Sequence, residues 1–239
     1  MFTRIAVLGS ANFIARLKQF EHELTSIRLD YYIYNTPIEA TIIVPSIKPC
    51  DAVFFSGSLP YIYAKEAREK LPVPSNYMRQ DETAISTTLL SICYSHGIPI
   101  HELSMDLLEP KTVETVLEDI GQKENYPFMM KFNATFDFKD VVSFHTNLQK
   151  SGQTSLAITS IHAVYQELHK KNLSVLRMID PKSSIIKAIE DTRSMALLAK
   201  SQSAKIAVGY IQLSLESTLS EMIIKIITST IQATVVQKE

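Results

Sequence analysis

The chain has 239 residues, of which 46% are hydrophobic, with 24 lysine and arginine residues against 25 aspartate and glutamate residues. This composition supplies a substantial core for one large domain or two small ones and argues against intrinsic disorder. The balanced charge disfavours direct nucleic-acid binding. The absence of a signal-peptide pattern and of an apolar run of about 20 residues predicts a cytoplasmic protein with no membrane partner.

Short apolar runs alternate with longer amphipathic segments along the first half of the chain. Strands are predicted over 5–8, 29–34 and 52–55, and helices over 13–27, 37–47 and 59–70. Prolines restrict 72–77 to a short or edge strand, because proline cannot donate to a strand ladder. A strong helix follows from Glu82 to His96, with apolar residues at helical spacing on one face.

The same alternation continues in the second half. Strands are predicted over 98–103, 128–132, 156–158 and 173–179, and helices over 111–120, 138–150, 161–171 and 181–200. Gly97, Gly121 and Gly152 each follow a helical segment, where a left-handed C-cap residue is favoured. Continuous apolar strands separated by amphipathic helices predict an α/β fold whose parallel sheets are covered on both faces.

The C-terminal region is predicted to be a strand and helix appended to these α/β units. The strand is expected over 205–213, and the helix over 217–238 with an apolar stripe from Leu219 to Ile227. Many β-branched residues disfavour an isolated helix, so this segment is expected to pack against its own sheet, another subunit or a domain outside this chain. Among these, packing against a second copy predicts a homo-oligomer.

No motif identifies a catalytic, cofactor or metal site. The sequence lacks a P-loop, a complete dinucleotide fingerprint, a nucleophile elbow and a complete zinc-protease motif. His145 is interpreted as a hydrogen-bonded core or cleft residue, and His162 and His169 as solvated positions on one helix face. We therefore predict no catalytic residue, no metal and no cofactor.

Polar residues that follow the predicted strands are the candidates for ligand binding, because ligands of open parallel sheets bind beyond the carboxyl ends of the strands. Small hydroxyl residues and glycine let helix N-termini approach an anion, a cationic side chain neutralises it, and tyrosine stacks on a ligand. Each also has a plain structural alternative, such as a tight turn or a helix cap. The candidates are Ser10, Ser56, Gly57, Ser58, Tyr61, Arg79, Thr83, Thr159, Ser160, Lys182 and Ser183.

Several stretches within residues 3–200 match the order of a known family. They are IAVLG, CDAVFFSGSLPYIYAKE, LPVPSNYMRQDETAISTTLL, TSLAITSIHAVYQELHKKNLSVLRM and DPKSSIIKAIEDTRSMALLAK, together with the alternating segments beyond Gly97. They resemble the N-terminal sensory domain of the propionate-catabolism activator, a periplasmic-binding-protein-like domain of bacterial transcriptional regulators. Where that family has Ser-Arg-Gly-Gly, this chain has Ser-Gly-Ser-Leu at 56–59.

The resemblance implies two Rossmann-like parallel-sheet lobes that face a cleft. The implied divisions are a first lobe over 1–96, a second lobe over 97–180, a returning helix over 181–200, a C-terminal segment over 201–239, and hinges near 95–98 and 179–182. It further implies a cytosolic sensor, part of a longer regulator, that binds a small polar or anionic metabolite in the cleft.

Two other functions remain open from the sequence. One is a metabolic transferase or isomerase acting on a small phosphorylated or carboxylate substrate, with Asp81, Glu82 or His145 as acid or base. The absence of paired carboxylates at a suitable spacing places this hypothesis below the sensor. The other is an oligomerisation module, which is compatible with a sensor.

Overall fold

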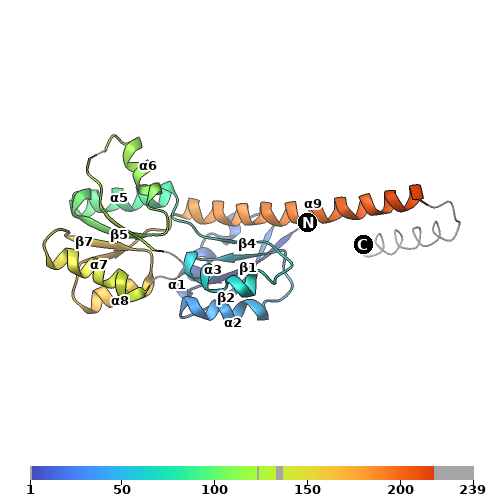
Figure 1. Ribbon diagram of the computed structural model, residues 1–239, viewed down its shortest axis with the longest axis horizontal. Coiled ribbons are helices and arrows are strands. Elements are labelled where there is room, and N and C mark those ends of the chain that lie inside the picture. Colours follow the sequence, from blue (N-terminus) through green and yellow to red (C-terminus); the bar gives the residue numbers. More distant parts are fainter. Residues whose placement is uncertain (1, 123, 133–136, 218–239) are drawn as a thin grey trace. The chain divides into compact units, whose positions relative to one another are not determined.

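The computed structural model describes residues 2–122, 124–132 and 137–217, and the side chains up to residue 202 (Figure 1). The chain divides into two compact units, residues 1–193 and 194–239, and both β-sheets lie in the first unit. Within the described ranges, no helix is both long enough and apolar enough to cross a membrane.

The first sheet has four parallel strands in the order β2-β1-β3-β4. These strands are β1 (Thr3–Gly9), β2 (Ile27–Ile33), β3 (Ala52–Phe55) and β4 (Ser75–Tyr77). They are connected by α1 (Ala11–Lys18), η1 (Glu21–Glu23), η2 (Pro37–Glu39), α2 (Ala40–Ile43), η3 (Val44–Ser46), α3 (Ser58–Tyr63) and α4 (Lys65–Arg68). Strands β1 and β3 contribute buried residues to an apolar cluster on each face, as expected for a sheet covered on both sides.

The second sheet also has four parallel strands, in the order β6-β5-β7-β8. These strands are β5 (Leu103–Leu107), β6 (Phe128–Lys131), β7 (Leu156–Thr159) and β8 (Val175–Arg177). They are accompanied by η4 (Ile100–Glu102), α6 (Lys111–Asp119), α7 (Phe138–Lys150) and α8 (His162–Lys170). No ladder joins the two sheets in the described part of the chain, so the predicted two-lobe α/β architecture is confirmed.

Helix α5 (Glu82–His96) packs in the second lobe. Its apolar residues Ile85, Leu89 and Ile92 belong to a buried cluster with residues of β5 and α6. The sequence placed this helix in the first lobe and a hinge at 95–98. Those residues instead connect two elements that pack in one cluster, so the chain passes between the sheets before α5, around residues 78–81.

Helix α9 (Lys182–Ser217) carries the chain back to the first sheet. Its residues Ile185 and Ile189 are fully buried in the cluster that contains Phe54 of β3. Hydrogen bonds of the Asp81 and Thr88 side chains connect the start of α5 to residues 179–184. Asp81 Oδ1 accepts hydrogen bonds from Ala84 N at 2.8 Å and from Ser184 Oγ at 2.9 Å, and Thr88 Oγ1 accepts one from Ile179 N at 3.1 Å.

Three predicted elements are wrong. Residues 205–213 continue α9 instead of forming a strand, because adding residues to an existing helix avoids the cost of nucleation. The strand expected over 98–103 begins only at Leu103. Because β5 contains the buried polar residues Ser104 and Asp106, its sequence does not show a continuous apolar run. The helix expected over 13–27 ends at Lys18. Beyond Ser217, the helix expected over 217–238 lies outside the described residues.

Candidate functional site

Three hydroxyl side chains gather at the carboxyl ends of β1, β2 and β3. Ser10 caps α1 by accepting a hydrogen bond from Phe13 N at 3.3 Å, and Tyr34 Oη lies 2.8 Å from Ser56 Oγ. Gly9 permits this close approach, because a Cβ at that position would lie 3.2 Å from the Cβ of Ser56 and 3.0 Å from Phe13 Cδ1. The first lobe therefore presents a compact polar edge.

The second lobe presents a cation and an imidazole at the equivalent edge. Arg177, the last residue of β8, donates from Nη1 to Nδ1 of His162 at 3.2 Å, and His162 is the first residue of α8. Burial and the positive charge of Arg177 lower the pKa of His162. Thr159 is fully buried, and its Oγ1 accepts a hydrogen bond from Ile161 N at 3.0 Å, so it supports the turn that places His162.

Burial shifts the pKa values of two groups near these strand ends. Burial raises the pKa of Tyr34, and the hydrogen bond to Ser56 and the Arg177 guanidinium partly oppose that rise. Burial also raises the pKa of Asp180, which Arg177 partly opposes. Tyr34 and Ser56 thus form a pair at the strand ends of the first lobe, and His162 and Arg177 form a pair at those of the second.

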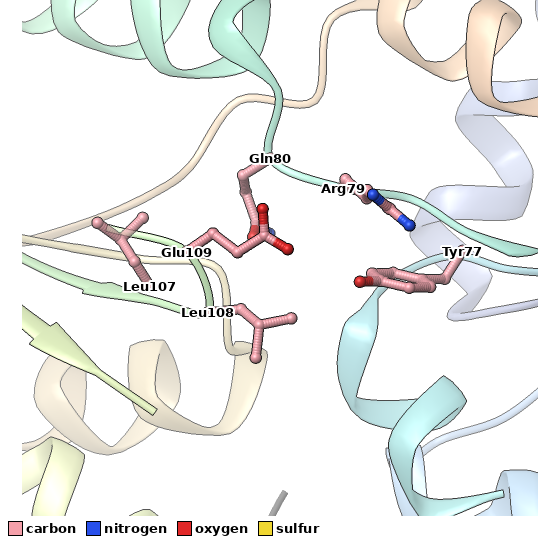
Figure 2. Close-up of a pocket in the computed structure, with 6 residues that line it drawn as sticks. All are labelled: Tyr77, Arg79, Gln80, Leu107, Leu108 and Glu109. Atoms are coloured by element: carbon pink, nitrogen blue, oxygen red, sulfur yellow. The ribbon is translucent and has the colours of Figure 1, made fainter. Parts of the chain in front are cut away.

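A small cavity lies at the carboxyl ends of β4 and β5 (Figure 2). Its volume is about 20 Å³, and its lining residues are Tyr77, Arg79, Gln80, Leu107, Leu108 and Glu109. The Tyr77 hydroxyl and the Glu109 carboxylate point into it from opposite lobes (Figure 2). Burial raises the pKa of Tyr77, and the guanidinium of Arg79 lies 5.2 Å from its ring centre. The cavity holds about one water molecule, so a metabolite needs the lining residues to move apart.

Three other candidates, Gly57, Ser58 and Tyr61, lie at or next to α3. Tyr61 packs 4.5 Å from the ring of Tyr77 and carries the Arg68 guanidinium 3.8 Å from its own ring centre. Ser58 is buried in the first turn of α3, and Gly57 precedes it with an extended backbone. Tyr61 therefore supports one wall of the cavity through Tyr77.

The remaining candidates are exposed, half-buried or already partnered. Lys182 forms an ion pair with Glu23 at 2.5 Å and lies 5.8 Å from the ring centre of Phe20. Thr83 and Ser183 are exposed, and Ser160 is half-buried directly after β7. The charge proposed for Lys182 is thus engaged by the first lobe.

The sequence reasoning missed three residues at this edge. Tyr34 and Arg177 were counted inside the predicted strands 29–34 and 173–179, although they lie at or beyond the strand ends. Glu109 was passed over because the position of β5 was wrong. Polar residues in the last positions of predicted strands were the available signal for Tyr34 and Arg177.

Two of the three side chains considered for an enzyme, His145 and Asp81, make structural contacts, and the third, Glu82, is exposed. His145 accepts or donates through Nδ1 to Ser104 Oγ at 2.8 Å and through Nε2 to Asp106 Oδ1 at 3.0 Å. The side chains of Ser104, Asp106 and His145 are fully buried, and Asp81 is engaged as the N-cap of α5. Within the described ranges, no three His, Cys, Asp or Glu side chains are grouped to hold a metal ion.

No family model and no curated protein matches this chain. Among solved structures, an NtrC family transcriptional regulator from Clostridium acetobutylicum is 12% identical with a TM-score of 0.54, and the match covers 83% of this chain and 98% of that one. A carbohydrate transporter from Acidothermus cellulolyticus, solved with myo-inositol, is 16% identical with a TM-score of 0.37, covering 74% of each chain. A periplasmic solute-binding protein from Actinobacillus succinogenes with bound D-allose is 13% identical with a TM-score of 0.37, covering 73% and 77%. The similarity to the NtrC family regulator confirms the two-lobe fold that the sequence resemblance implied.

Proposed function

We propose that this chain is a ligand-sensing domain that binds a small polar or anionic metabolite between its lobes. The observation that carries the proposal is the cavity lined together by residues at and beyond the carboxyl ends of β4 and β5, because these strands belong to two separate parallel sheets. Polar pairs also lie at strand ends of both sheets, Tyr34–Ser56 on the first and Arg177–His162 on the second. In open parallel sheets, ligands bind at this edge. The fold shared with an NtrC family transcriptional regulator supports a role as the cytoplasmic effector-sensing part of a bacterial regulator.

Binding is expected to act through the relative stability of two lobe arrangements. A cavity of about 20 Å³ excludes a metabolite, so the ligand enters when the lobes part and is enclosed when they close. The ligand shifts this equilibrium only by the difference between its affinities for the two arrangements. Residues 78–81 and 178–181, where the chain passes between the sheets, are the segments that absorb the movement.

Titration calorimetry of the full chain against small carboxylates, phosphates and sugars tests this function. We expect one compound to bind with a dissociation constant in the micromolar range, equivalent to about −8 kcal/mol. Arg79→Ala is expected to weaken that binding, because Arg79 lines the cavity, whereas Arg28→Ala on the exposed part of β2 leaves it unchanged. A complete panel without any binding contradicts the proposal.

We further propose that the chain forms a homo-oligomer through its C-terminal unit. On α9, Met195, Leu197 and Leu198 are 39%, 46% and 59% exposed, which leaves apolar surface uncovered in the described part of that unit. Light scattering is expected to show a dimer that Leu198→Glu converts to a monomer, while Ser201→Glu, an exposed polar position of the same helix, does not. A monomeric parent protein contradicts this proposal.

A further inference from the structure

The cavity of Figure 2 is lined by one cation and one carboxylate, which come from different sheets. Arg79 follows β4 of the first sheet, and Glu109 follows β5 of the second. The Glu109 carboxylate points toward Tyr77 and Arg79 (Figure 2). Neither Arg79 nor Glu109 pairs with an oppositely charged side chain among the described residues. Two opposite charges at one cavity are therefore both available to a ligand.

The backbone anchors both charged residues beside the cavity. Met78, directly before Arg79, is buried, and its N–H donates to Phe55 O at 2.9 Å. Glu109 O accepts a hydrogen bond from Thr112 N at 3.2 Å in the turn that begins α6. Beyond these anchored backbones the side chains of Arg79 and Glu109 are exposed, so they can adjust to a ligand without disturbing either sheet.

Tyr77 adds a hydroxyl that neighbouring rings and cations hold in place. Its ring lies 4.5 Å from the ring of Tyr61, and the Arg68 guanidinium lies 3.8 Å from the centre of the Tyr61 ring. Burial raises the pKa of Tyr77, the Arg79 guanidinium opposes this rise, and the Glu109 carboxylate adds to it. The hydroxyl therefore keeps its proton near neutral pH and can donate to a ligand oxygen in the cavity.

We propose that the ligand is an amino acid in its zwitterionic form, whose carboxylate binds the Arg79 guanidinium and the Tyr77 hydroxyl and whose ammonium group binds the Glu109 carboxylate. This inference rests on the proposed function, because it names the ligand class of the same cavity. Leu107 and Leu108 supply apolar surface beside these groups, which suits the carbon atoms of the ligand. The sequence alone pointed only to a polar or anionic metabolite.

Charge complementarity favours a zwitterion over the other classes of small polar ligand. When the lobes close, Arg79 and Glu109 lose water, and a charge without a counter-charge is costly in such surroundings. An anion pairs with Arg79 but is repelled by Glu109, and a cation meets the reverse problem. A neutral polyol can hydrogen-bond to both side chains but neutralises neither. A zwitterion compensates both charges, and its carboxylate matches the forked donors of a guanidinium.

Titration calorimetry of the full chain tests this inference. The probes are the standard amino acids, measured one at a time, and lactate, alaninol and ribose as an anion, a cation and a neutral polyol. We expect one amino acid to bind most tightly. Its 2-hydroxy acid lacks the ammonium group, and its amino alcohol lacks the carboxylate. Each is expected to bind the parent protein about tenfold more weakly or worse, because each loses a charge-assisted hydrogen bond.

Two variants assign the two ends of the ligand. Glu109→Gln is expected to weaken amino-acid binding about tenfold and to remove most of the preference over the 2-hydroxy acid, because the ammonium group loses its counter-charge. Arg79→Gln is expected to weaken the amino acid and the 2-hydroxy acid alike, since both present a carboxylate. Glu118→Gln on α6 and Arg28→Gln on β2 change exposed charges outside the cavity and are expected to leave the affinity unchanged.

The inference is overturned if the 2-hydroxy acid or the amino alcohol binds the parent as tightly as the amino acid does. It is also overturned if Glu109→Gln or Arg79→Gln binds the amino acid as tightly as the parent. Binding of lactate, ribose or another compound of the metabolite panel without binding of any amino acid overturns the inference but leaves the proposed function standing. That result is expected if Arg79 and Glu109 pair with each other when the lobes close. Failure of every amino acid and of the whole panel overturns both.

Discussion

Replacing His145 with leucine is expected to lower the free energy of unfolding by about 2–6 kcal/mol, at about 1–3 kcal/mol for each of two buried partners left without its hydrogen bond. His145 contacts Asp106 at 3.0 Å and Ser104 at 2.8 Å, and all three side chains are fully buried. The substitution leaves a carboxyl and a hydroxyl without those bonds. Asp106 Oδ2 already lacks a hydrogen-bond partner among the described residues, so it provides no hydrogen bond that could replace the one lost at Oδ1.

Urea denaturation of a short series of variants measures this effect. The double variant Asp106→Leu/His145→Leu is expected to be more stable than His145→Leu alone, because it removes the uncompensated polar group together with its partner. Asn147→Leu changes an exposed position on the same helix and is expected to stay within about 0.5 kcal/mol of the parent. A His145→Leu variant as stable as the parent contradicts the importance of this chain of hydrogen bonds.

Replacing Ile189 with alanine is expected to lower the free energy of unfolding by about 2–5 kcal/mol, the range for truncating a buried aliphatic side chain. Ile189 is fully buried in the first-lobe cluster with Phe54 and Ile185, although 126 residues lie between the end of β3 and the start of α9 in the chain. The cost arises from the lost transfer of apolar atoms out of water and from the cavity that remains.

Lys187→Ala provides the control for Ile189→Ala. Lys187 lies on the same helix but is exposed, so its truncation is expected to change stability by less than about 0.5 kcal/mol. Thermal and urea denaturation of both variants give the comparison. Equal stability of the two variants contradicts the packing of the start of α9 in the first lobe.

Elements with strong local signals were predicted correctly. Helix α5 has the expected bounds, because Asp81 caps its first turn by accepting from Ala84 N and Gly97 ends it with a φ of 65°. Both signals act within a few residues of the chain. The same holds for β4, where the prolines before Ser75 confine the strand to the edge of its sheet.

Some of the residues predicted to bind a ligand lie at strand ends or line the cavity, and their role in binding stays a prediction. Ser10, Ser56 and Arg79 lie at strand ends or line the cavity, as the strand-end rule requires. Tyr34 and Arg177 were missed, because which residue ends a strand depends on the neighbouring strand with which it pairs. The predicted ranges ran one or two residues too far at both positions.

The sequence by itself determined the alternation of apolar strands and amphipathic helices, and therefore the parallel α/β class. Only the tertiary structure decided that α5 covers the second sheet, that the start of α9 returns to the first, and that Ser104, Asp106 and His145 satisfy one another in a core. The physical reason is that an apolar stripe specifies a need for an apolar surface without specifying which surface supplies it. A buried polar residue likewise depends on a partner that is distant in the chain.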